Sequence, residues 1–267
     1  MDNLESEHHG LQAEHGLSFW IQSNQFNMLF DVGGGAATIQ NAQQMGLDLS
    51  TLPVVVCSHS HYDHCGGFPH LLRHSKVGTL VTGPGFFEPK YSFDGTKYTF
   101  LGAPFDHTLL QEQGIAHQVC IGLLQLAEGC YVVGNFNRSH PLEEVPKRFV
   151  RQTQQGVKPD LFEDEICLVL QTKKGLAVVV GCSHPGILNI LQTVVQQLKQ
   201  PICTVIGGTH LIEADEERIR HTVSEMQQMG LKLLGLSHCS GEVAERYVST
   251  LTNVMGCHLA VGESILL

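Results

Sequence analysis

The sequence predicts a layered α/β fold, and two observations support this prediction. The last third of the chain repeats one unit, in which an apolar strand is followed by small residues, a histidine and an amphipathic helical pattern. An apolar run that ends in histidines also occurs earlier, at residues 52–64. Because ligands gather at the carboxyl ends of strands in layered α/β architectures, we expect these four strand ends to converge on one site.

Composition limits the classes of function. The chain has 267 residues, 42% hydrophobic and 16% charged, so it can bury a full core. Its formal net charge of −10 opposes binding to a phosphate polymer, and we expect no nucleic-acid partner. It lacks an apolar run of about 18 residues and an ordinary signal peptide, so we expect no membrane association. The nine scattered cysteines, an odd number, are typical of a reduced, cytoplasmic chain with packed thiols.

The first elements read as a hairpin and a helix. Two strand-like runs, at residues 14–21 and 26–31, flank a short polar turn. The glycines at 33–35 allow a tight bend but lack the spacing of a dinucleotide-binding loop. A helical pattern follows at residues 36–45, and Asp31 is a candidate cap for this helix.

The strongest chemical signal follows the run at residues 52–57, which is apolar and β-branched and reads as a short buried strand. Side chains alternate along a strand, so His59 and His61 leave its end on the same side. Asp63 and His64 then turn the corner before a short helix at 68–73. Three imidazoles and a carboxylate so close together supply ligands for a borderline divalent metal such as zinc, manganese or iron.

The middle of the chain gives weaker signals. After a strand at 79–82, we expect the Gly- and Pro-rich segment 83–104 to form an irregular loop over the site. Its aromatic side chains either wall a ring-shaped substrate or pack in the core. They are Phe86, Phe87, Tyr91, Phe93 and Tyr98. Strands at 121–126 and 130–133 lead to a basic cluster, which either holds a small anionic substrate or lies in a solvated loop. The cluster comprises Arg138, Lys147, Arg148 and Arg151.

Paired strands at 166–171 and 176–180 open the last third of the chain, where three strand ends carry a histidine. The histidines are His184 after the strand 176–180, His210 after 202–206 and His238 after 231–236. Helical patterns follow at 187–198, 215–229 and 242–250. For any single histidine, the alternative is that a cap or a backbone group satisfies its ring.

The arrangement His59-x-His61-x-Asp63-His64 after an apolar strand resembles the signature of the metallo-β-lactamase superfamily. The resemblance implies a four-layer αββα sandwich over residues 1–267, a single domain, with one or two metal ions at one edge of its sheets. It implies that His184 and His238 complete the ligands, with His59, His61 and His184 on one side and Asp63, His64 and His238 on the other. Asp63 is the expected catalytic residue. Asp31 is then expected beneath the metals, as the alternative to its role as a helix cap.

One position departs from the family pattern. Many members carry an aspartate that bridges two metals where this chain has Cys182. A cysteine there is either a thiolate ligand or a small residue in a tight turn. The family's separate histidine motif between the first cluster and this strand is not evident, because His107, His117 and His140 lack its context.

Further motifs resemble one branch of the superfamily, named for the archaeal enzyme that joins a dihydropterin methyl group to ribofuranosylaminobenzene 5'-phosphate. They lie at residues 14–18, 181–186, 207–211 and 238–241. The chain begins about where this branch would have completed its first strand, so we expect one edge strand to be missing. The resemblance also implies that Arg138 and His210 contact the substrate, with Glu143 or Glu144 as alternative partners of Arg138.

These observations predict an enzyme with one or two divalent metal ions, zinc being expected and manganese or iron the alternatives. We expect hydrolysis of a small, phosphorylated ester through a metal-bound hydroxide. The first alternative is the pterin transferase reaction, and the second is a metal-binding or redox protein without turnover. The sequence does not predict the oligomeric state.

Overall fold

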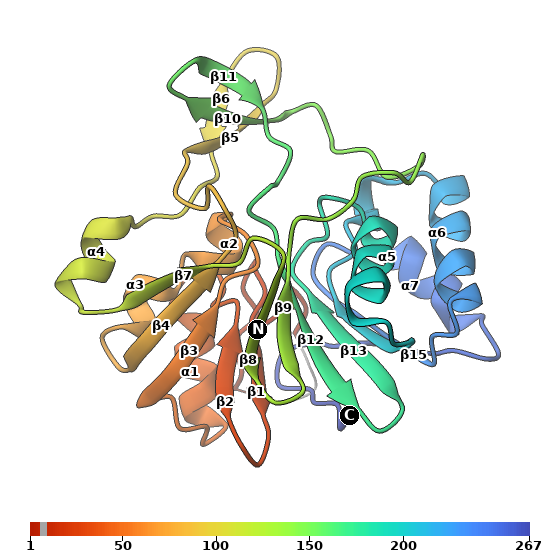
Figure 1. The fold of residues 1–267 in the computed structure, drawn as a ribbon, viewed down its shortest axis with the longest axis horizontal. Helices are drawn as coiled ribbons and strands as arrows, with labels where there is room; N and C mark the ends of the chain where they lie inside the picture. The colour runs from red at the N-terminus through yellow and green to blue at the C-terminus, as the bar shows by residue number, and fades with distance from the viewer. Residues whose placement is uncertain (6–9) are drawn as a thin grey trace.

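Two sheets face each other in the computed structural model, which describes residues 1–5 and 10–267 (Figure 1). The first sheet has five strands, in the order β1 (Phe19–Gln22), β2 (Asn27–Phe30), β3 (Thr51–Val56), β4 (Lys76–Thr82) and β7 (Ala116–Val119). Its first pair is the predicted antiparallel hairpin, and the remaining strands run parallel.

The second sheet has seven strands. Their order is β16 (Met255–His258), β15 (Leu233–Leu236), β14 (Ile202–Gly207), β13 (Gly175–Val180), β12 (Cys167–Thr172), β9 (Cys130–Val133) and β8 (Leu123–Ala127). Strands β13 to β16 are parallel, so their carboxyl ends lie at the same edge. This is the geometry that the repeated strand–histidine–helix unit predicts.

Helices cover the outer face of each sheet, which completes the predicted αββα order (Figure 1). The five-stranded sheet is covered by α1 (Ala37–Gln44), α3 (Phe68–Leu71) and α4 (His107–Glu112), with α2 (Tyr62–Cys65) as a single turn near its upper edge. The seven-stranded sheet is covered by α5 (Ile187–Leu198), α6 (Glu216–Gln228) and α7 (Glu242–Ser249). A short 3₁₀ turn, η1 (Leu211–Glu213), precedes α6. Among the described residues, no helix is long and apolar enough to cross a membrane.

Alternation along the central strands divides the core into three parts. In β3, Val55 packs with the helices of its own sheet, whereas Val56 packs against the opposite sheet. In β13, Val178 and Val180 face α5 to α7, whereas Val179 faces the other sheet. Strands buried on both faces are continuous apolar runs. This pattern is why both strands were recognisable in the sequence.

A third sheet, which the sequence analysis missed, lies above the sandwich (Figure 1). Its order is β11 (Gly156–Pro159), β10 (Phe149–Thr153), β5 (Lys90–Phe93) and β6 (Tyr98–Phe100). The prediction of an irregular loop at 83–104 was therefore wrong. The Asp94 carboxylate accepts hydrogen bonds from the backbone N–H groups of Thr96 and Lys97, which closes a hairpin there, and β5 pairs with the distant β10.

The basic cluster is also divided by this sheet, because Arg151 lies in β10 instead of a surface loop. Arg151 forms ion pairs with Glu88 and Glu163, each at 2.9 Å.

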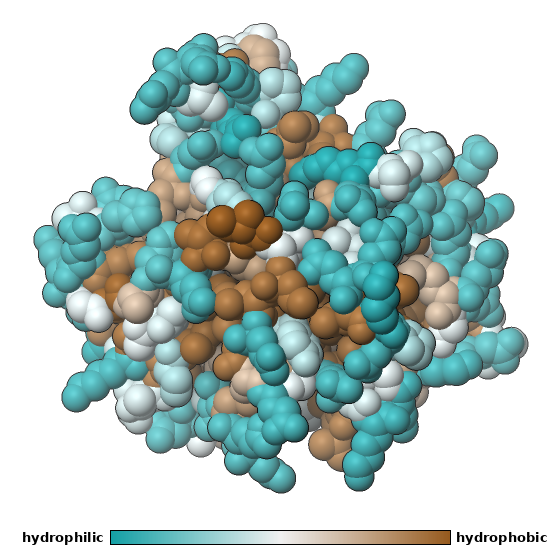
Figure 2. All heavy atoms as spheres, viewed as in Figure 1, coloured by the Kyte–Doolittle hydropathy of each residue, from teal (hydrophilic) through white to brown (hydrophobic). Residues whose placement is uncertain are grey.

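Figure 2 shows apolar side chains gathered across the middle of the face that is seen in Figure 1, where the two main sheets meet. The nine cysteines, all within the described residues, are free, and eight of them are buried.

Candidate metal centre

The predicted ligands meet at the upper edge of the sandwich, where β3, β13, β14 and β15 end. His59 and His61 follow β3, and His64 lies in α2. The ring of His184, after β13, has its centroid 5.0 Å from those of both His59 and His61. The ring of His238, after β15, lies 5.0 Å from that of His64. The predicted convergence of strand ends is therefore present.

One half of the centre consists of His59, His61 and His184, all buried. The Nε2 atoms of these three rings have no hydrogen-bond partner among the described residues. Burial lowers the pKa of each ring well below its ordinary value. The rings are therefore neutral, which is the form that binds a metal ion.

The other half is centred on the carboxylate of Asp63. Its Oδ2 atom lies 3.3 Å from His238 Nε2 and 3.8 Å from His64 Nε2. It also lies 3.2 Å from Nε2 of His15, a residue that the sequence analysis quoted only as part of a motif. Burial on its own raises the pKa of Asp63, but the neighbouring histidines hold it well below its ordinary value.

Cys182 lies between the two halves. Its Sγ atom is 3.0 Å from His64 Nε2. It belongs to one group of mutually close ligand atoms with His59 and His184, and to another with His64 and His238. Both groups fit within 4.8 Å. The thiol therefore occupies the position that a ligand shared by two ions would need. Without an ion, burial raises the pKa of the thiol well above its ordinary value.

Two imidazole rings of the centre, those of His59 and His64, are oriented by contacts to their Nδ1 atoms. His64 Nδ1 donates to Asp31 Oδ2 at 2.7 Å. Ser58 Oγ donates to the same carboxylate at 2.8 Å and lies 2.9 Å from His59 Nδ1. Because an ionised carboxylate only accepts, the Ser58 hydroxyl must accept from His59 Nδ1. Each ring consequently turns an Nε2 lone pair towards the centre, where that of His59 has no partner among the described residues and that of His64 contacts the Cys182 thiol.

Asp31 lies beneath the histidines, as the family resemblance implies. Its carboxylate also accepts a hydrogen bond from the backbone N–H of Ser58, at 2.6 Å. The alternative role as a cap is wrong, because α1 begins after Ala36 and has no side-chain cap. Asp31 has a φ of +58°, one of several residues here with a left-handed backbone. Position 181, next to the Asp31 carboxylate, must be a glycine, because a Cβ atom at this position would lie 2.1 Å from Ser58 Oγ.

His238 is held by the first residues of the chain. Asn3 Oδ1 accepts from His238 Nδ1 at 2.9 Å and from the backbone N–H of Gly16 at 3.0 Å. Asp2 Oδ2 accepts from the His238 backbone N–H at 2.7 Å. The other oxygen of Asp2 contacts His258, whose second nitrogen contacts Glu245. Neither Asp2 nor Asn3 carries a recognisable signal in the sequence, because their partner is more than two hundred residues away.

A buried acidic loop before β12 supports the first half of the centre. Glu165 accepts from the backbone N–H groups of Ser183 and His184, and burial raises its pKa to about 8. Asp164 accepts from the backbone N–H of Ser60 at 3.0 Å and pairs with the buried Lys90. These contacts hold the loops that carry His59, His61 and His184 in place.

His210 lies beside His184, with ring centroids 4.4 Å apart. Burial lowers its pKa, but Cys239 and Glu213 outweigh this effect and raise it to about 9. Glu213 also forms a two-point ion pair with Arg148. His210, Cys182 and Cys239 form a further group of close ligand atoms, and Cys239 was not predicted.

Two phenylalanine rings enclose the first half of the centre. Phe162 stacks on His184 with centroids 3.9 Å apart, and Phe149 lies 5.5 Å from the His61 ring. The predicted aromatics lie elsewhere: Phe86 and Phe87 pack around Phe105, while Tyr91, Phe93 and Tyr98 pack together on the third sheet.

Arg138 differs from both sequence interpretations. Its guanidinium group donates to the backbone carbonyl groups of Leu161 and Phe162, and no ion pair with Glu143 or Glu144 occurs among the described residues. Arg138 therefore holds the loop that carries Phe162. His107 and His117, which lacked a family context, lie against Phe87, away from the centre.

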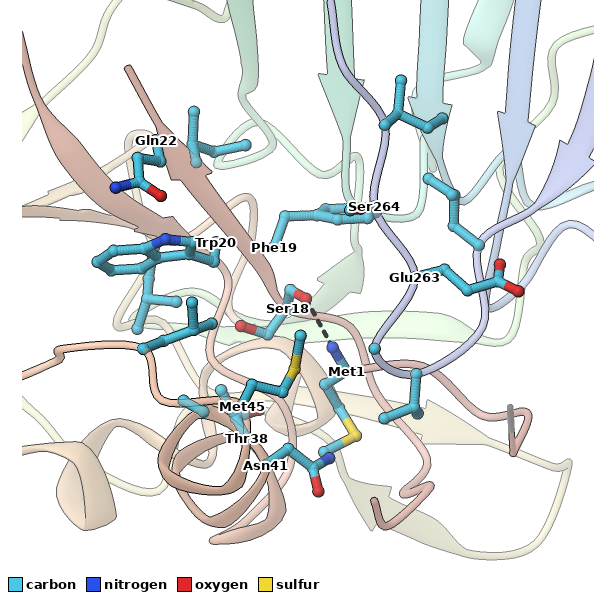
Figure 3. A pocket seen from close by; sticks show the side chains of 18 of the residues that line it. Met1, Ser18, Phe19, Trp20, Gln22, Thr38, Asn41, Met45, Glu263 and Ser264 are labelled. Atoms are coloured by element: carbon cyan, nitrogen blue, oxygen red, sulfur yellow. Dashed lines mark hydrogen bonds between the residues drawn. The ribbon is translucent and has the colours of Figure 1, made fainter. Parts of the chain in front are cut away.

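A separate cavity of about 340 Å³ lies between β1, α1 and the last residues of the chain (Figure 3). It is apolar for the most part, and the amino group of Met1 donates to the carbonyl of Ser18 at its edge. None of the candidate ligands lines it. The cavity is therefore not part of the candidate centre.

The sandwich and its edge cluster of imidazole, carboxylate and thiol groups define a protein of αββα architecture with a candidate metal centre. The chain belongs to the metallo-β-lactamase superfamily, whose family model matches residues 11–159. It is 31% identical, over 87% of this chain and 83% of the relative, to a protein of Methanocaldococcus jannaschii. That relative is named 7,8-dihydropterin-6-methyl-4-(beta-D-ribofuranosyl)-aminobenzene-5'-phosphate synthase. This similarity confirms the predicted branch.

Two further comparisons extend the similarity. The structure resembles that of Tm1679, described as a metal-dependent hydrolase of the beta-lactamase superfamily. The TM-score is 0.82 and the identity 30%, over 96% of this chain and 93% of the other. A hydroxyacylglutathione hydrolase of Synechococcus sp. is 32% identical over 55% of each chain.

Proposed function

We propose that the protein is a metal-dependent hydrolase that acts on a small, anionic ester, with a phosphorylated ester as the expected substrate. One observation carries the proposal: contacts to Nδ1 orient the rings of His59, His64 and His238, so that their Nε2 atoms are the ones left to bind an ion beside Cys182. Rings oriented in this way are characteristic of metal ligands. The similarity to Tm1679 supports hydrolysis as the class of reaction.

His59, His61 and His184 would hold one ion, and Asp63, His64 and His238 would hold a second, with Cys182 between them. This mixed set of nitrogen, oxygen and sulfur ligands suits zinc, and manganese or iron are alternatives. A bound divalent ion supplies Lewis acidity and lowers the pKa of water that it binds.

The chain itself positions the reactants. Phe149 and Phe162 exclude water from the side of His61 and His184. The opposite side is open at His15, whose side chain is 61% exposed and contacts Asp63. A substrate would therefore enter past His15, and Asp63 would face it from within the centre.

Positive groups near the centre favour an anionic substrate. His210, with a pKa of about 9, carries a positive charge at neutral pH in the ion-free protein. Arg148 lies on the same side, over the ring of Phe149, with 4.2 Å between the guanidinium carbon and the ring centroid. In a chain with a net charge of −10, these two groups, which share the carboxylate of Glu213 in this structure, are the cations that a phosphate group at the centre would contact.

The second candidate function is the pterin transferase reaction, which the 31% identity to the M. jannaschii synthase favours. In that reaction the ions would hold a diphosphate leaving group while an aromatic carbon attacks the methyl group. The same positive groups would serve both reactions, so the fold and the ligands do not separate them.

A substrate panel on the metal-replete protein tests the proposal. It contains phosphorylated esters, neutral esters such as lactones, and the pterin and aminobenzene substrates of the transferase. We expect turnover of a phosphorylated ester, no turnover by Asp63→Ala, and a KM raised by at least about tenfold in Arg148→Ala. A lactone should be insensitive to Arg148→Ala. Turnover of neutral esters alone would reject the phosphate preference, and a condensed pterin product would favour the transferase.

A further inference from the structure

A second group of metal-ligand side chains lies outside the candidate centre. His140 Nε2 is 3.1 Å from Glu225 Oε1, and His221 Nε2 is 3.0 Å from the same oxygen. All three ligand atoms lie within 4.8 Å of one another. His221 and Glu225 are one turn apart on α6, whereas His140 comes from the segment between β9 and β10. Figure 1 shows this segment running over α5 towards α6.

The position of His140 is fixed independently of Glu225. The buried side chain of Asn189, in α5, accepts hydrogen bonds from the backbone N–H groups of Ser139 and His140, at 3.1 and 3.0 Å. The amide of Asn189 is itself held by the carbonyl of Pro185. The His140 side chain is only 7% exposed. His140 is therefore held by contacts that need no ion, so ordering it costs little conformational entropy on binding.

The spacing fits a small tetrahedral ion. Ligand atoms about 2.0–2.1 Å from zinc lie roughly 3.3–3.4 Å apart in a tetrahedron, so the two contacts need to lengthen by only a few tenths of an ångström. Coordination through Nε2 requires the proton of His140 on Nδ1. The backbone N–H of Leu142 is 3.4 Å from that atom, which is long for a hydrogen bond. Placing the proton on Nδ1 therefore gives up only a weak contact with Leu142.

The local charge also favours a cation. Glu143 is buried, and both of its carboxylate oxygens lack a hydrogen-bond partner among the described residues. Its charge acts on Glu225, and an ion at Glu225 would offset the repulsion between the two carboxylates.

We propose that His140, His221 and Glu225 bind a zinc-like divalent ion that clamps the segment between β9 and β10 to α6. Two imidazoles and one carboxylate leave a fourth position for water. The ligand His140 is two residues along the chain from Arg138, which holds the backbone of Phe162 beside the candidate centre. The ion thus has a structural role, separate from the ions of the candidate centre.

Zinc counting tests this site, with zinc alone as the probe. Protein equilibrated with chelator-buffered zinc is measured by elemental analysis in four forms: wild type, His221→Ala, Arg220→Ala, and the double variant His59→Ala, His61→Ala. Arg220 forms an exposed pair with Glu216 on the same helix and is the matched control. We expect His221→Ala to bind one zinc ion fewer than both wild type and Arg220→Ala.

The double variant separates this site from the candidate centre. We expect zinc to raise its melting temperature, and we expect this rise to become smaller when His221→Ala is added. Anomalous scattering from zinc-soaked crystals should place an ion between His140, His221 and Glu225. Equal zinc content in wild type and His221→Ala, or no zinc-dependent stabilisation of the double variant, would overturn the proposal.

Discussion

At the residue scale, several side chains around the candidate centre orient imidazole rings, and in the proposed function these rings would bind an ion. Asp31, Ser58 and Asn3 each contact an Nδ1 atom, directly or through a hydroxyl, and so leave an Nε2 lone pair free. This orienting layer raises ligand basicity and fixes the tautomer. The chemistry of the centre therefore depends on residues that bind no ion themselves.

Cys182 gives the first prediction at this scale. Because its Sγ atom is close to ligands of both halves, Cys182→Ser should lower the affinity for divalent metal by at least about tenfold. The cobalt-substituted wild type should show a sulfur-to-metal charge-transfer band that the variant lacks. A wild-type cobalt spectrum without this band would reduce Cys182 to a packing residue.

Asn3 gives the second prediction at the residue scale. Asn3→Ala removes the acceptor for His238 Nδ1, which frees the ring to rotate, and should lower affinity for one ion by roughly 10–100-fold. Asn3→Asp retains an acceptor and is the control. Metal titrations should show a weakened second binding step and an unaffected first step. Identical titrations for Asn3→Ala and wild type would show that Asn3 does not position the ligand.

At the scale of elements, the repeated strand–histidine unit was readable because each part of it is local in sequence. Strands β13 to β15 and helices α5 to α7 lie within a few residues of their predicted bounds. The third sheet was not predictable in this way, since β5 pairs with β10 across more than fifty residues and its sequence is rich in turn-forming residues. Likewise, Asp2 and Phe162 reach the centre only through tertiary packing.

The contact between the first residues, β16 and α7 predicts a pH dependence. Hydrogen bonds to Asp2 and Glu245 raise the pKa of His258 to about 10, from about 6.5 in an unfolded chain. The folded chain holds this proton more tightly, so its stabilising effect is complete below about pH 6.5 and is lost as the pH rises towards 10.

Urea unfolding between pH 6 and 10 measures this effect. The free energy of unfolding of wild type should fall across this range relative to that of His258→Gln, because other groups titrate equally in both proteins. Parallel curves would show that His258 is not protonated in the fold.

At the scale of the whole molecule, the sandwich brings the two halves of the centre together. His59, His61 and His64 come from the five-stranded sheet, whereas His184 and His238 come from the seven-stranded sheet. The core between the sheets fixes their separation, so the centre requires both. The family signature predicted which residues meet, whereas the enclosing phenylalanines and the role of Arg138 became visible only in the packed molecule.

The central claim is that this edge of the sandwich binds divalent metal. Elemental analysis of purified His221→Ala, which lacks the proposed clamp, tests it most directly. We predict one or two ions per chain that a strong chelator removes, and fewer ions after His59→Ala and His61→Ala are added, with the fold retained because these residues lie in loops. An unchanged metal content in the variant with both further substitutions would contradict the account.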